Sequence, residues 1–258
     1  NASLGNGWDV GNQSRVGALF GATFQNSWER REYREVYPNL NGDELQVQNE
    51  YDFEDLSNLV QLGVMGVIEG EITKEHSVRS TTFFVQDTEY LGRRYIGEHA
   101  DIGDTIRVER TQYVARSMMV QQFVGEHQFP NLWNGFVNWR ATWSGAGRLE
   151  PDRRDIILQP AEAGGWRLRT QGGGNGILYG ALEDENYDAG IDLGFDIGDR
   201  DDKTRFSFTV QGGGSVMERT RRVDVRRFTY DLRTNPEESD TSFLVNEPQA
   251  IFDSGNIS

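Results

Sequence analysis

Five arginines stand close together in the last quarter of the chain, and their side chains suit anion binding. A guanidinium group presents paired N–H donors that match the two oxygens of a carboxylate or phosphate. A small anionic ligand is therefore one interpretation of the cluster. Ion pairing with neighbouring acidic residues, among them Glu218 and Asp224, is the alternative. The five arginines are Arg219, Arg221, Arg222, Arg226 and Arg227.

Few other residues are suited to catalysis. The chain has no cysteine, and its only imidazoles, His76, His99 and His127, are widely spaced in the sequence. The Gly-x-Ser-x-Gly motif of serine hydrolases is absent. We therefore expect no catalytic residue, no cofactor and no metal, so that the chain is not an enzyme. A calcium site in a polar turn is the alternative left open, formed by Asp196, Asp199, Asp201 and Asp202.

Composition narrows the class of protein. The 258 residues carry a net charge of −15, which argues against a nucleic-acid partner because such a partner needs a basic surface. Apolar residues alternate with polar ones at a period of two, and no long stretch follows the helical period. No composition shift marks a domain boundary, so residues 1–258 are expected to form one all-β domain.

The clearest strand runs from Tyr187 to Ile197. Its odd positions hold Tyr or apolar residues, and its even positions hold only Asp and Gly. Such a strand has one face in an apolar environment and the other in a polar one. The alternation does not say whether the apolar environment is a protein core or a lipid bilayer.

Aromatic residues bracket a second strand, predicted over residues 132–144. Trp133 and Trp143 share one face and lie ten positions apart. At about 3.3 Å per residue and a tilt near 40°, they would be separated by roughly 25 Å along a membrane normal, the height of the apolar band of a transmembrane barrel. With Tyr187, they are the candidate membrane-facing aromatic girdle. Core tryptophans of a β-sandwich are the alternative.

Five more strands bring the predicted total to about seven. They are centred on residues 16–24, 56–68, 78–85, 112–124 and 206–211. The connections alternate in length, with short polar turns at 69–75, 125–131 and 198–202 and long polar segments at 34–49, 91–105, 148–178 and 225–258. This asymmetry is typical of outer-membrane barrels. Because seven is odd, we expect an antiparallel up-and-down transmembrane β-barrel of which this chain supplies a partial set of strands.

Several stretches, in collinear order, resemble the barrel of TonB-dependent outer-membrane receptors, in the larger branch common in Bacteroidota. One contains Glu150-Pro-Asp-Arg-Arg154, which is similar to an "EPD-x-R" element of that branch. The stretches are residues 109–117 with 125–127, 146–154, 206–208 with 221–228, and 249–257.

This resemblance implies a 22-stranded barrel with a plug, which takes up a scarce nutrient such as a siderophore, cobalamin or an oligosaccharide. The implied partners are the rest of the barrel and the plug, TonB through the plug region, the lipid bilayer of the bacterial outer membrane and an unidentified small molecule. No plug is visible in the sequence. A secreted or surface β-sandwich, acting as an adhesin or carbohydrate-binding module, is the alternative.

Overall fold

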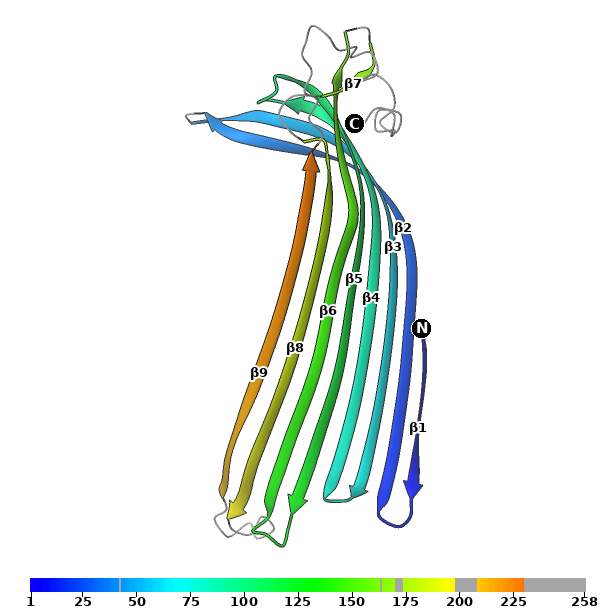
Figure 1. Cartoon of the computed structure of the whole chain (residues 1–258), viewed down its shortest axis with the longest axis vertical. Coiled ribbons are helices and arrows are strands. Elements are labelled where there is room, and N and C mark those ends of the chain that lie inside the picture. Colours follow the sequence, from blue (N-terminus) through cyan, green and yellow to red (C-terminus); the bar gives the residue numbers. More distant parts are fainter. Residues whose placement is uncertain (42, 163, 170–173, 198–207, 230–258) are drawn as a thin grey trace.

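The computed structural model describes residues 1–41, 43–162, 164–169, 174–197 and 208–229. These residues form nine strands in a single antiparallel sheet (Figure 1). The sheet order is β1-β2-β3-β4-β5-β6-β8-β9, and β7 pairs with β6 beside that path. The strands are β1 (Ala2–Val10), β2 (Ser14–Asn41), β3 (Glu44–Thr73), β4 (His76–His99), β5 (Asp104–Phe129), β6 (Gly135–Pro160), β7 (Trp166–Leu168), β8 (Gly176–Ile197) and β9 (Phe208–Thr229).

The sheet has an up-and-down topology and is not closed. Each long strand pairs with the long strand next to it in sequence, and β1 and β9 each pair on one side only within the described residues. The expectation of an all-β, antiparallel, up-and-down fold is confirmed. All seven predicted strands correspond to strands of the sheet, although Phe206 lies outside the described residues. The short strands β1 and β7 were not predicted.

Three of the four long polar segments expected to be loops, 34–49, 91–105 and 148–178, are mostly strand, and residues 230–258 of the fourth lie outside the described residues. β2 reaches Asn41 and β3 begins at Glu44, β4 and β5 continue to a turn at residues 100–103, and β6 reaches Pro160. The prediction failed because charged and polar residues interrupt the apolar alternation in these extensions, and such polarity alone does not separate a strand hairpin from a loop. The turns β1–β2, β3–β4 and β5–β6 all lie at the lower end of the sheet in Figure 1.

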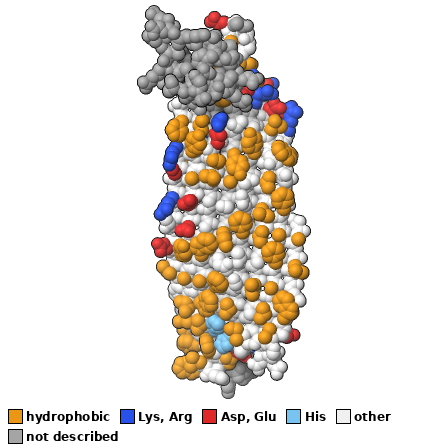
Figure 2. Space-filling view, turned by 45° about the vertical axis from the view of Figure 1, so that its right-hand side comes forward, with side chains coloured by type: hydrophobic (Ala, Val, Ile, Leu, Met, Phe, Trp, Pro, Cys, Tyr) orange, Lys and Arg blue, Asp and Glu red, His pale blue; other side chains and the backbone are white. Residues whose placement is uncertain are grey.

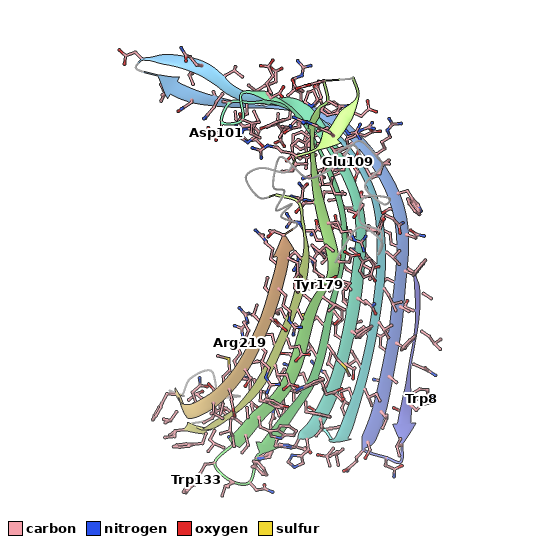
Figure 3. All side chains as sticks on the ribbon, turned by 45° about the horizontal axis from the view of Figure 1, so that its top comes forward. Trp8, Asp101, Glu109, Trp133, Tyr179 and Arg219 are labelled. Atoms are coloured by element: carbon pink, nitrogen blue, oxygen red, sulfur yellow. The ribbon has the colours of Figure 1, made fainter. Side chains whose placement is uncertain are left out.

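The two faces of the sheet follow from the register of the strands. Trp143 pairs with Tyr187 and shares its face, which we call the outer face. The opposite face, which carries Asp184 and Arg219, is called the inner face. In Figure 3 the sheet is curved, and Trp8 on the outer face and Arg219 on the inner face lie on its two sides.

A small hydrophobic core lies on the inner face of the upper hairpins. Tyr51, Phe53, Ile106 and Val108 are buried there. The rings of Tyr33 and Phe53 stack at 4.9 Å. Elsewhere the sheet has little core, since one layer of strands buries few side chains.

Candidate functional site

The outer face carries a broad apolar surface that nothing in the described chain covers. Phe24 is 64% exposed, Ile68 59% and Val216 69%. These side chains come from β2, β3 and β9, so the surface crosses nearly the whole sheet. Figure 2 shows hydrophobic side chains spread over this face, with charged groups gathered at its top and one edge. An exposed apolar surface of this extent is typical of a membrane or protein contact.

Charged residues are excluded from the lower part of the outer face. Going up β2, the outer-facing residues from Val16 to Trp28 carry no charge, and the first charged residue is Arg30. Going up β8 from Ile197, the first is Glu185. On the described strands β3 to β6, which lie between β2 and β8, the lower outer face likewise carries no Asp, Glu, Lys or Arg. Apart from Tyr, the ionisable side chains there are the two outer-facing histidines, His76 and His127.

Aromatic side chains stand near the upper limit of the apolar surface. Trp143 and the half-exposed Tyr187, two of the three candidate girdle residues, form a cross-strand pair. Tyr90 and Tyr113 form another such pair, and Trp28 lies in register with Tyr90 across one residue of β3. These three aromatic residues were not among the predicted girdle.

Trp133 does not belong to the strand in which it was predicted. It lies in the turn before β6, with a positive φ of 53°, and its ring is 77% exposed. Its ring centroid lies 6.4 Å from that of Phe195. The alternation of β6 therefore cannot be extended back to Trp133, and the vertical spacing deduced from Trp133 and Trp143 does not apply.

Two histidines on the apolar surface, His76 and His127, are in hydrogen-bond contact with each other. Trp139 Nε1 donates to His127 Nε2 at 3.1 Å, and His127 Nδ1 lies 3.3 Å from His76 Nδ1. With His127 protonated on Nδ1 and accepting at Nε2, each contact has one donor and one acceptor. Gly125 makes room for the Trp139 indole, since a Cβ there would lie 2.2 Å from Nε1. This chain of hydrogen bonds pairs polar atoms of both imidazoles within the apolar surface.

The inner face carries a ladder of ion pairs. Arg116 pairs with Asp87 at 2.9 Å, and Arg140 with Asp188 at 3.3 Å. Arg219 and Arg221 both donate to Asp184. Charges on one face and apolar groups on the other make the whole sheet amphipathic.

The five clustered arginines are divided between the two faces. Arg219, Arg221 and Arg227 point to the inner face, whereas Arg222 and Arg226 point to the outer face, because successive residues of β9 alternate. Arg226 pairs with Asp224 at 2.8 Å. The predicted anion-binding cluster is therefore not one site, and only Arg227 lines an inner-face pocket.

That pocket, of about 380 Å³, contains two further arginines that sequence reasoning missed. Arg110 and Arg153 both bind Asp155, which is one-quarter exposed like its two partners. Opposite Asp155, the wall is completed by Asn175, whose Oδ1 accepts from the Ile157 N–H at 2.6 Å. The pocket is partly open and has a polar lining on the inner face.

A β-bulge in β6 brings Arg153 and Asp155 to this face. In the pairing with β8, Glu150 is opposite Gly180 and Arg153 opposite Leu178, so that β6 has one extra residue. Below the bulge, odd-numbered residues of β6 point outward, and beyond it they point inward. Pro151, at the bulge, is the signal in the sequence that could have indicated it, because proline cannot donate to a ladder.

Above the aromatic residues of the outer face, an ion pair between Arg93 and Asp55 lies next to the hydrophobic core of the upper hairpins. Arg93 donates two hydrogen bonds to Asp55, at 2.8 and 2.7 Å, and the Tyr33 hydroxyl donates to the same carboxylate. Hydrogen bonding from Arg93 lowers the pKa of Asp55, although burial of this carboxylate opposes the shift. Asp55 is thus held ionised within a nearly dry site.

No protein-family model and no curated protein matches this chain. Among the described residues, no helix is long and apolar enough to span a membrane. The same part of the chain contains no group of three or more acidic or histidine side chains placed to hold a metal ion. Of the four aspartates considered for calcium, Asp199, Asp201 and Asp202 lie outside the described residues.

Proposed function

We propose that this chain is part of the barrel wall of a bacterial outer-membrane receptor that takes up a small nutrient. The observation that carries the proposal is the charge-free apolar surface on one side of a single sheet whose other side carries a ladder of ion pairs. The apolar outer face suits contact with a lipid bilayer, and the charged inner face suits contact with a water-filled lumen.

The upper limit of the apolar surface is continuous across six neighbouring strands. Following the register from Arg30 through each strand leads to Ile177 on β8. The first charged outer residue lies within two positions of this line on β3, β4, β5 and β6, and eight positions below it, at Glu185, on β8. Such a continuous apolar band is what a lipid-facing barrel wall requires.

A β-sandwich is less well supported by the same observations. A sandwich needs a second sheet over the apolar face of the first, and the described residues form one sheet. The assignment to TonB-dependent receptors rests on the collinear sequence resemblance, of which the Glu150–Arg154 element coincides with the bulge of β6. Active uptake, a plug, and TonB as partner belong to this proposal.

Replacing one residue on each face tests the contact with lipid. Ile191 lies in the middle of the apolar stretch of β8, and Asp192 is its inner-facing neighbour. Because arginine at the bilayer midplane costs about 2–4 kcal/mol, Ile191→Arg should lower the free energy of unfolding from phosphatidylcholine vesicles by about that amount. Asp192→Arg, the matched control, should change it by less than about 1 kcal/mol.

The measurement is a urea titration of the full-length protein refolded into vesicles and followed by tryptophan fluorescence. Equal effects of the two substitutions would contradict the proposal. So would a full-length protein that stays monomeric and folded in buffer without detergent, because its apolar face would then be covered by protein.

A further inference from the structure

We infer that the inner-face pocket between β5, β6, β8 and β9 binds a small oxyanion, a carboxylate or phosphate group, through Arg110, Arg153 and Arg227. This inference deepens the proposed function by naming the class of ligand, and it rests on that function only in assigning the inner face to the lumen. The pocket of about 380 Å³ falls within the range of small-molecule sites.

The charges of the pocket do not balance. Among the described residues, three arginines line it, with Asp155 as the only carboxylate. Asp155 already accepts from Arg110 and Arg153. The local surplus is therefore two positive charges, in a chain whose overall charge is −15. An anionic ligand would neutralise the pocket in the way that side chains neutralise the rest of the inner face.

Arg227 differs from the other arginines along the inner face. Arg93, Arg116 and Arg140 each pair with a carboxylate on a neighbouring strand. Arg227, by contrast, has no ion pair with any described residue and is exposed to solvent. It lies in register with Leu178, which lies in register with Arg153. Arg153 and Arg227 thus flank one apolar residue from either side, and two guanidinium forks can converge above it.

Close backbone packing shapes the wall of the pocket at the same place. The wall next to Arg153 is the segment Gly174-Asn175-Gly176, in which Gly174 has a φ of 153° and a Cβ would lie 2.4 Å from Ile157. Asn175, which is only 6% exposed, fixes this segment by donating to the Arg169 carbonyl. The bulge in β6 turns Arg153 toward the same space, and bulges commonly re-aim side chains beside binding sites.

Calorimetry on the detergent-solubilised full-length protein tests the inference, with pyrophosphate and succinate as probes. We expect one site per chain for at least one probe, with binding weakened about tenfold or more by Arg227→Gln, since a hydrogen bond to a charged group contributes at least that factor. Arg226→Gln is the matched control, because it removes the adjacent arginine, which points to the outer face. It should leave binding unchanged. The probe that binds more tightly identifies the oxyanion as phosphate or carboxylate.

Arg227→Lys provides a second test that keeps the charge and removes the fork. It should retain part of the affinity, even if Arg227→Gln folds poorly. The inference is overturned if neither probe binds the wild-type protein, if Arg226→Gln and Arg227→Gln weaken binding equally, or if Arg227→Gln has no effect. Failure of the proposed function would look different: the protein would be water-soluble without detergent, while the response of probe binding to these substitutions stayed the same.

Discussion

At the scale of single residues, the carboxylate of Asp55 is a tightly held and almost fully buried charge. Its side chain is 3% exposed, and three hydrogen bonds from Arg93 and Tyr33 converge on it. Arg93 also lies over the Phe53 ring, 5.6 Å from its centroid. The ion pair is thus built into the aromatic core that joins the upper hairpins. A substitution at Asp55 would leave a partly buried guanidinium without its counter-charge.

We expect Asp55→Asn to lower the free energy of unfolding by about 2 kcal/mol at pH 7, the usual loss for hydrogen bonds to a charged group. The pKa of Asp55 is lowered in the folded state, so the folded protein binds fewer protons than the unfolded one. The contribution of the ion pair is complete above the unfolded pKa, near 4, and is lost as the pH falls through the lower folded pKa. Urea unfolding at pH 7 and pH 3 should therefore give a smaller difference between wild type and variant at pH 3. A difference that is the same or larger at pH 3 would contradict this assignment.

At the scale of strands, alternation could be read from the sequence but its interruptions could not. The apolar face of residues 187–197 follows from a period of two, whereas the pairing of Trp143 with Tyr187 depends on the register between β6 and β8, which alternation does not specify. Arg153 was missed because one extra residue at Pro151 reverses the alternation, and such a bulge depends on pairing with β5 and β8. Trp133 was misplaced for a similar reason, since the strand starts at Gly135. The five arginines were grouped by closeness in sequence, whereas alternation places them on two faces.

Removing the extra residue tests the role of the bulge. Deletion of Pro151 removes the extra residue, so β6 should pair regularly with β8 and Arg153 should stay opposite Leu178 on the inner face. We expect the oxyanion probes still to bind and the free energy of unfolding to change by less than about 1 kcal/mol. Pro151→Ala keeps the residue count and should keep both properties as well. If the deletion abolished probe binding while Pro151→Ala kept it, the bulge itself, and not the pairing of β6 with β8, would position the pocket.

At the scale of the whole molecule, the sheet has two edges. In β1 and β9, every second backbone amide points away from the one strand that pairs with it among the described residues. In lipid, each unpaired N–H or C=O group would cost several kcal/mol, so the proposed barrel requires further strands at both edges. The sequence predicted a partial set of strands, and the described sheet is open. The pairing of the described strands does not identify the strands that would close the proposed barrel.

Hydrogen exchange can test whether these edges are paired. In the full-length protein in detergent, peptides from β9 should exchange as slowly as peptides from β5, which is paired on both sides. Mass spectrometry after minutes of labelling provides the measurement. Rapid exchange of about half of the β9 amides would show that this edge is open to water, and the barrel proposal would then be wrong for this side of the sheet.

The extra residue of β6 also affects how this chain should be compared with others. Aligning β6 with a regular strand by constant spacing would assign every position after Pro151 to the opposite side of the wall. An inner-face residue such as Arg153 would then be aligned with outer-face positions, and a charged side chain would be compared with apolar ones. An alignment that carries a one-residue gap at this point restores the correspondence, so relatives that bind the same class of ligand should be sought with the gap in place.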